Sequence, residues 1–187
     1  VDYKNSGTLD NIDDYILEFR GLGGYDFSVF TASTLTPYLG IGYRYLNDDM
    51  SGKTSSTGAL GYERESNYLS SPIGVEIITP LENGWSVGAT AEYDIFWWGK
   101  QISYLSDVDP GFNDPENRQK KGYGIRGSVK LQKKGEKLDF VIEPFIRYWN
   151  IKKSKDADIT YYGTVIGYGW EPKNNSTEIG CRLAVKF

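Results

Sequence analysis

From residue 15 onward, apolar and polar residues alternate at every second position over most of the chain, the pattern of a β-strand with one apolar face. The clearest run covers residues 85–98. Its apolar positions are Trp85, Val87, Ala89, Ala91, Tyr93, Ile95 and Trp97, and its polar or small positions are Ser86, Gly88, Thr90, Glu92 and Asp94. Similar runs occupy residues 15–27, 37–45, 69–77, 123–132, 138–148 and 178–187. The sequence therefore predicts seven strands.

The length of these runs suits strands that cross a membrane. Several of them reach the ~9–11 residues that a tilted strand needs to span a bilayer. No apolar run comes near the ~20 residues of a membrane-spanning helix. The mean hydropathy of −0.48 is compatible with a barrel, because each barrel strand has only one apolar face. The 15 Tyr and 22 Gly residues favour twisted, tightly paired strands.

Short and long connections alternate between the predicted strands. Residues 82–84 and 133–136 are tight turns, whereas residues 47–67, 99–121 and 152–175 are long and polar. In bacterial barrels, short turns face the periplasm and long loops face outward. The alternation therefore predicts an antiparallel up-and-down transmembrane β-barrel, a single domain over residues 1–187. A soluble barrel remains the alternative, although it has no reason to place every long loop at one end.

Large aromatic residues lie near both ends of the predicted strands. Trp97, Tyr148 and Trp149 are close to the long loops, and Trp85 is close to a short turn. Aromatic rings at both ends of a strand are typical of the girdle at the membrane–water interfaces. We therefore predict an aromatic girdle of these four residues. The alternative is that the rings cap a soluble core.

Two segments resemble small outer-membrane barrels of the OmpA/OmpX type. Residues 36–45 (TPYLGIGYRY) resemble a strand found widely in these proteins, and residues 180–187 (GCRLAVKF) resemble their C-terminal assembly signal, carried here by Leu183, Val185 and Phe187. The resemblance implies the outer membrane of a Gram-negative bacterium and contact with outer-membrane lipid and lipopolysaccharide. It also implies biogenesis through the barrel-assembly machinery. It implies no particular activity.

The strand count is odd, whereas single-chain bacterial barrels have even counts. Counting back from Phe187 places residues 1–14 on the outer side. We therefore expect Val1-Asp2-Tyr3 to be the end of a strand that begins before Val1. The barrel would then have about eight strands, or ten if a hairpin precedes them.

The positions predicted to face the barrel interior carry balanced charges. The acids are Glu18, Glu76, Glu92, Asp94, Asp139, Glu143 and Glu178, and the bases are Arg20, Arg44, Arg126, Lys130, Arg147, Arg182 and Lys186. The interior of an eight-stranded barrel is just wide enough for side chains to fill. Because an unpaired buried ion costs several kcal/mol, equal numbers of both signs predict a salt-bridged plug. A narrow channel for ions or small solutes is the alternative, particularly with ten strands.

Catalytic and cofactor chemistry has little support. Small barrel enzymes such as omptin proteases, lipid A-modifying enzymes and the outer-membrane phospholipase depend on a histidine, and this chain has none. Glu92 and Asp94 could share a proton on one strand face, but neutralisation by Arg126 or Arg147 is the preferred interpretation. We therefore predict that the chain is not an enzyme.

Metal and nucleic-acid binding are not predicted either. The oxygen-rich residues 107–117 could hold Ca²⁺, but they lack EF-hand spacing, and acidic loops are usually solvated. Cys181 falls on the apolar face as a small filler. A net charge of −4 provides no basic footprint for nucleic acid. No cofactor and no metal site are predicted.

The long loops contain the remaining functional information. Residues 55–64 and 160–170 mix Tyr, Trp, Gly and Ser, which is the composition of adaptable binding surfaces. The second segment is equally compatible with a strand extension that packs on its neighbours. The main prediction is a structural or surface-interaction protein whose loops bind a partner, at the cell surface or in an envelope complex. A porin-like channel is the second hypothesis, and an outer-membrane enzyme is the third.

Overall fold

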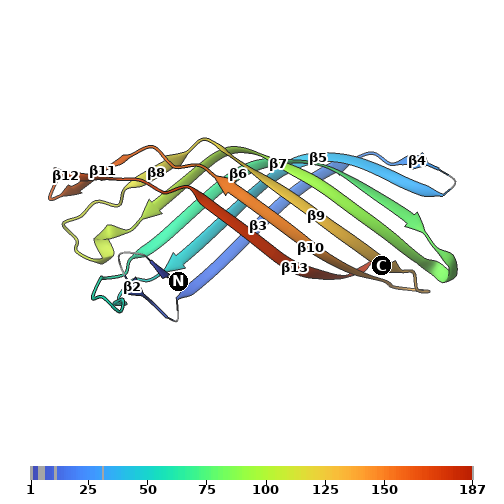
Figure 1. Ribbon diagram of the computed structural model, residues 1–187, viewed down its shortest axis with the longest axis horizontal. Helices are drawn as coiled ribbons and strands as arrows, with labels where there is room; N and C mark the ends of the chain where they lie inside the picture. The colour runs from blue at the N-terminus through green and yellow to red at the C-terminus, as the bar shows by residue number, and fades with distance from the viewer. Residues whose placement is uncertain (1, 4–6, 11, 31, 187) are drawn as a thin grey trace.

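A computed structural model describes residues 2–3, 7–10, 12–30 and 32–186. The fold is all-β, and its main sheet curls into a half-barrel (Figure 1). Seven long strands pair in the order β13-β10-β9-β7-β6-β5-β3, so that each strand pairs antiparallel with the long strand that follows it in the chain. These strands are β3 (Asp13–Gly24), β5 (Ser33–Asp49), β6 (Glu63–Pro80), β7 (Trp85–Ser103), β9 (Gly122–Lys133), β10 (Asp139–Ile151) and β13 (Asn174–Lys186). Each overlaps one predicted run, which confirms the all-β antiparallel prediction.

Three strands continue well beyond their predicted ends. β5, β6 and β7 contain 17, 18 and 19 residues. Their backbone pairing continues as far as Asp49 opposite Glu63 and Arg64 opposite Ser103. A short strand, β8 (Glu116–Gln119), pairs with the end of β7. Much of the predicted loop region is therefore an extension of the sheet.

The last long connection also contains strands. β11 (Ala157–Tyr161) and β12 (Thr164–Gly169) form a two-stranded hairpin separate from the main sheet. A β-bridge between Phe112 and Tyr161 and several hydrogen bonds connect this hairpin to the preceding long loop. The segment is therefore a strand hairpin, as one of the two interpretations expected, but it does not extend the main sheet, and its Val165, Ile166 and Tyr168 side chains are exposed. Recognition of a partner is left as a proposal.

The first residues do not extend the main sheet. β1 (Asp2–Tyr3) pairs with β2 (Gly7–Thr8) in a separate two-stranded sheet, whereas β4 (Phe27–Val29) belongs to the main sheet through its pairing with β5. The backbone N–H of Ser56 donates to the carbonyl of Thr8 at 2.9 Å, so the segment docks on a long loop. Asp2 and Tyr3 therefore pair locally, and the strand expected to begin before Val1 stays a prediction. Val1 lies outside the described residues.

The short turns lie at one end of the sheet. Asn83 and Gly84 both have positive φ, 57° and 72°, in a conformation whose twist matches that of a two-stranded hairpin. The backbone N–H of Lys134, in the next short turn, donates to the carbonyl of Gly84 at 2.8 Å. The long connections gather at the opposite end (Figure 1). The predicted alternation of connections is therefore confirmed.

A bulge in β7 interrupts the predicted alternation. Phe96 pairs with Ser70 and Trp98 pairs with Leu69, which leaves Trp97 as the extra residue. As a result, Trp97 and Trp98 are both exposed, whereas Phe96 is buried. Beyond Trp97, the positions that face inward and outward are therefore shifted by one residue along β7.

The two faces of the sheet have opposite chemistry. The outer face exposes large apolar side chains on every long strand, and the inner face buries charges. Among the exposed residues are Phe19, Leu39, Ile41, Ile73, Ile125, Val129, Phe140, Ile146, Ile179 and Leu183, and among the buried ones are Arg44, Glu92, Asp94, Lys130, Glu143 and Arg147. None of the described residues belongs to a helix long and apolar enough to cross a membrane.

A small apolar cluster lies on the inner face near the long loops. Tyr68, Phe96, Trp149 and Ile151 are buried together, with Leu46 packed against them. A Cβ atom at Gly124 would lie 3.1 Å from the Trp149 ring, so glycine makes room for it.

Trp149 is therefore not a girdle residue, because its side chain faces inward and is 7% exposed. Trp85 and Trp97 are exposed, as the girdle requires, and Tyr148 is partly exposed.

Candidate functional site

Ion pairs cover the inner face, and most of them join strands that are not neighbours in the sheet. We call this set the inner ion-pair network. Its pairs are Arg20–Glu92, Arg44–Glu178, Lys130–Glu76, Arg147–Glu18, Arg147–Glu178 and Arg182–Glu143. Glu92, Lys130 and Glu143 are less than one-tenth exposed. The network therefore neutralises most of the predicted interior charges in pairs, as buried ions require.

Arg147 joins the two edges of the sheet. Its guanidinium on β10 binds Glu18 on β3, and its Nη2 lies 2.7 Å from Glu178 on β13. Arg44 on β5 also binds Glu178. Within the described residues, β3 and β13 do not pair through their backbones. The curl of the sheet nevertheless brings Glu18 of β3 and Glu178 of β13 to the same cation, Arg147.

The buried acid pair on β7 has a different partner from the one predicted. Arg126 lies directly opposite Glu92 in the β7–β9 register. The Glu92 carboxylate instead binds Arg20 and accepts a hydrogen bond from the Tyr38 hydroxyl at 2.7 Å. The expected neutralisation of Glu92 by Arg126 or Arg147 is therefore wrong. The reason is the curl, which brings β3 across the inner face toward β7.

Three of the predicted interior charges, Arg126, Asp94 and Asp139, lie apart from this network. The Arg126 guanidinium stacks over the Phe145 ring, 4.8 Å from its centroid. Asp94 is buried in the same narrow space as Arg20 and Arg147 but forms no direct ion pair with a described side chain. Asp139 lies at a short turn, where it accepts hydrogen bonds from Gln132 and the Gly135 backbone. The side chain of Lys186 lies outside the described residues.

The inner space narrows at Arg147. The cavity lined by Glu18 and Arg147 has a volume of only ≈ 10 Å³. A cavity of ≈ 290 Å³, lined by Tyr38 and Arg126 among others, lies on the side of the short turns. Another of ≈ 230 Å³, lined by Tyr68 and others, lies on the side of the long loops. The ion pairs around Arg147 thus form a constriction between two wider spaces.

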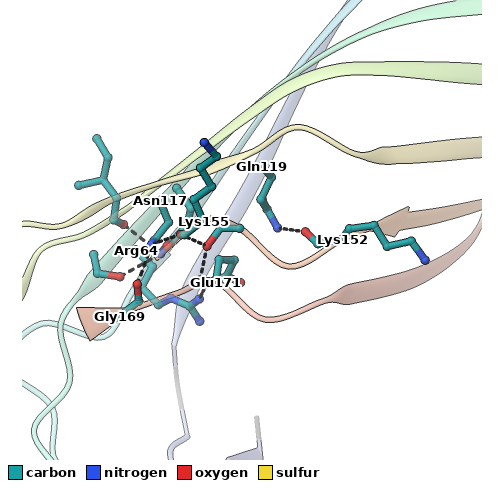
Figure 2. A network of polar contacts seen from close by, with 11 residues as sticks. Arg64, Asn117, Gln119, Lys152, Lys155, Gly169 and Glu171 are labelled. Carbon is teal, nitrogen blue, oxygen red and sulfur yellow. Dashed lines mark hydrogen bonds and ion pairs between the residues drawn. The ribbon is translucent and has the colours of Figure 1, made fainter. Parts of the chain in front are cut away.

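A second polar cluster ties the long loops together, and we call it the loop platform (Figure 2). Its side chains are Arg64, Gln101, Asn117, Gln119, Ser154 and Glu171. The Asn117 side-chain amide donates to the carbonyls of Lys155 and Gly169, both at 3.1 Å. The Gln119 amide donates to the carbonyl of Lys152 at 3.0 Å. Strand β8 therefore holds the connection that follows β10.

The same platform fixes the segment before β13. Arg64 on β6 pairs with Glu171 at 2.6 Å. The Ser154 hydroxyl accepts a hydrogen bond from the Glu171 N–H at 2.8 Å, and the Ser154 N–H donates to the Glu171 carbonyl at 3.0 Å. Loops that carry so many internal hydrogen bonds present a preorganised surface, which lowers the entropic cost of binding.

The oxygen-rich segment 107–117 uses its oxygens internally. Asp114 accepts hydrogen bonds from the N–H and hydroxyl of Ser106, and Asp109 accepts one from the Gly111 N–H. Asn113 accepts one from the Thr160 N–H at 2.6 Å. In the part of the chain that the structure describes, no group of three or more Asp, Glu, Cys or His side chains is placed to hold a metal ion.

The remaining predicted residues lie on the outer face or outside the description. Leu183 and Val185 are exposed on β13, with Cys181 on the same face. Phe187 lies outside the described residues. The platform amides Gln101, Asn117 and Gln119 were missed by sequence reasoning, because single amides do not stand out in a polar loop.

No family model matches this chain, and no curated relative matches its sequence. The function must therefore be argued from the geometry of the two polar clusters.

Proposed function

We propose that this chain is an outer-membrane β-barrel protein of structural or surface-interaction type. In this proposal the outer face contacts lipid and lipopolysaccharide, the inner ion-pair network plugs the lumen, and the loop platform binds a partner outside the cell. The resemblance to small barrels of the OmpA/OmpX type and assembly by the barrel-assembly machinery belong to the same proposal.

The observation that carries the proposal is that apolar side chains are exposed on the outer face of the sheet and charged side chains are buried on the inner face, the reverse of the usual arrangement in a water-soluble protein. Ile146 and Ile179 are 51% and 82% exposed, whereas Glu92 and Glu143 are nearly solvent-free. In water, apolar area left exposed forgoes about 25 cal/mol of stabilisation per Å². The arrangement becomes favourable when hydrocarbon covers the outer face and the charges pair inside.

The spacing of the aromatic residues fits a bilayer. Trp85 and Trp97 lie near the two ends of the apolar part of β7. Twelve residues at ~3.3 Å each make about 40 Å of strand. A tilt of about 45° reduces this height to about 28 Å, close to the ~30 Å of a hydrocarbon core. β5, β6 and β7 then extend beyond the bilayer and carry the loop platform.

Closure of the barrel requires one further strand in this proposal. β3 and β13 each leave one side without a sheet partner among the described residues, and lipid cannot hydrogen-bond exposed strand edges. A strand between them would give eight, an even number typical of single-chain bacterial barrels. The shared contacts of Arg147 with Glu18 and Glu178 support edges that lie close together.

A narrow channel is the second candidate. The cavities on either side of Arg147 favour it, because only the constriction separates them. In planar bilayers, the plugged barrel should give no steady conductance once its folding has been verified by heat-dependent gel mobility. Steady ion-selective openings would replace the plug with the channel.

A charge on the outer face tests membrane insertion directly. Ile146 lies opposite Gly127, about midway between the aromatic ends of the sheet. Ile146→Lys should lower the free energy of folding into phosphatidylcholine vesicles by about 2–4 kcal/mol. Ile166→Lys, at an exposed position in β12, should change it by less than about 0.5 kcal/mol.

In a water-soluble fold, both isoleucines are already exposed and both variants should be nearly neutral. Equal, small effects, together with a wild-type chain that stays monomeric in buffer and does not associate with vesicles, would therefore overturn the proposal.

A further inference from the structure

A cavity opens inside the loop platform, between the extended strands and the β11–β12 hairpin. Its volume is ≈ 280 Å³. Gln101 and Asn117 lie opposite each other on β7 and β8 and line it, together with Tyr62, Trp170 and the Arg64–Glu171 pair. We propose that this cavity binds a small neutral saccharide, which would make a sugar the ligand of the proposed surface protein. The inference rests on the proposed function, in which these loops form the binding surface.

The wall of the cavity includes Gln101, a buried side chain whose amide oxygen lacks a donor. The Gln101 side chain is 1% exposed, and its amide nitrogen donates to the Ile102 carbonyl and the Ser103 hydroxyl, both at 3.1 Å. Its Oε1 has no hydrogen-bond partner among the described residues. Buried polar groups are nearly always hydrogen-bonded in native proteins. A ligand hydroxyl would supply the missing donor.

Aromatic rings supply the apolar contacts that a sugar ring needs. Trp170 lines the cavity and is 52% exposed. The ammonium of Lys153 lies over the Trp170 indole, 4.1 Å from the ring centroid. This cation–π contact favours one orientation of the ring. Tyr62 also lines the cavity. The apolar C–H face of a pyranose can pack on such rings while its hydroxyls contact amides and charged groups.

The local charge favours a neutral ligand. Arg64 and Glu171 both line the cavity, but they are 2.6 Å apart and neutralise each other. An anionic ligand would therefore compete with Glu171 for the guanidinium, and a cationic ligand would compete with Arg64. Hydroxyl groups can instead donate to the carboxylate and accept from the guanidinium without separating the pair.

The volume limits the ligand to a small unit. Drug-sized ligands occupy pockets of roughly 300–1,000 Å³, so this cavity lies at the lower limit of that range. One sugar residue fits that size. The residue can be a free monosaccharide or the end of a surface polysaccharide, because both present the same ring and hydroxyls.

Saturation-transfer NMR with monosaccharides tests the inference. The full chain is folded in amine-oxide micelles, because maltoside detergents carry sugar headgroups, and titrated with glucose, galactose, mannose and N-acetylglucosamine. We expect at least one of them to bind with a millimolar dissociation constant. Trp170→Ala and Gln101→Leu should each weaken that binding at least tenfold, whereas the distant exposed tryptophan variant Trp85→Ala should not change it.

Three results would overturn the inference. One is the absence of binding by folded wild-type protein up to 50 mM sugar, and another is binding that neither cavity variant weakens. The third is tighter binding of glucuronate than of glucose, which would contradict the neutral site. If an oligosaccharide ending in the preferred sugar binds at least as tightly as the monosaccharide, the source is a polysaccharide end; weaker binding assigns the free sugar.

The vesicle experiment with Ile146→Lys separates this inference from the proposed function. A protein that inserts into vesicles but binds no sugar contradicts only the saccharide site. A protein that binds sugar but does not insert contradicts the membrane assignment.

Discussion

The inner ion-pair network and the loop platform connect distant parts of the chain in different ways. The network mainly joins charged side chains of strands that are not neighbours in the sheet, such as Arg147 on β10 and Glu18 on β3. The platform mainly joins side-chain amides to backbone carbonyls, as Asn117 does with Lys155 and Gly169. One region therefore depends on the neutralisation of ions, and the other on satisfying the backbone of long loops.

This difference predicts different responses to mutation. Removing one member of a buried ion pair leaves a charge without a counterion. Removing an amide leaves neutral carbonyls without a donor, which costs less.

The largest effect is expected from Arg147→Ala. The change leaves the carboxylates of Glu18 and Glu178 without the cation that both share. The free energy of unfolding should fall by about 3–5 kcal/mol, measured by urea denaturation in micelles. Arg118→Ala is the matched control, because Arg118 pairs with Glu116 but its side chain is 63% exposed, and it should cost less than about 1 kcal/mol. Similar losses in both variants would show that the inner pairs are not buried.

An intermediate effect is expected from Asn117→Ala. Two loop carbonyls lose their donor, so the free energy of unfolding should fall by about 1–3 kcal/mol. Hydrogen exchange should accelerate in residues 152–156 and 164–171 and remain unchanged in β9 and β10. Asn175→Ala, at an exposed position on β13, serves as control. Faster exchange throughout the sheet would contradict a local role for the platform.

The smallest effect concerns an acid pair on the loop side of the sheet. Asp48 lies opposite Asp14 in the β3–β5 register, beyond the aromatic rings of Tyr15 and Tyr45. Burial, followed by the neighbouring Asp14 carboxyl, raises the pKa of Asp48 to about 6. The folded state therefore holds this proton more tightly than the unfolded state, whose Asp pKa is about 3.9.

Protonation of Asp48 stabilises the fold below about pH 4, and this contribution is lost as the pH rises through about 6. Asp48→Asn should remove this dependence and stabilise the protein at pH 7. Solvent screening limits the gain to about 1 kcal/mol or less. The test compares urea midpoints of the wild type and the variant at pH 4, 5, 6 and 7. A difference that does not grow with pH would show that Asp48 is already charged at pH 4.

Strand positions were predictable because the period-two signal is local. In β7 the predicted run and the observed strand begin at the same residue, Trp85. The exception is the bulge at Trp97, which leaves Phe96 on the inner face but moves Trp98 to the outer face, where unbroken alternation does not place it. A single extra residue leaves no compositional mark, so its position is visible only through pairing with β6.

The interior charges were predictable as a set, but not as pairs. Alternation places Glu92 and Arg126 on the same face, and the register even sets them opposite each other. The choice of Arg20 as the cation for Glu92 depends on how far the sheet curls, since Arg20 is on a strand three positions away in the sheet order. The sequence alone does not give the distance between β3 and β7 across the inner face.

The sequence by itself determined the strands, their order along the chain, the apolar and charged faces, and the separation of short turns from long loops. These features follow from residue type and from the two-residue repeat of an extended backbone. Only the tertiary structure decided which charges meet across the inner face, where Trp149 points and how Gln101 and Asn117 come to line one cavity. Each of these depends on the curl of the sheet or on contacts between loops, where small changes in backbone direction determine which side chains lie within hydrogen-bond distance.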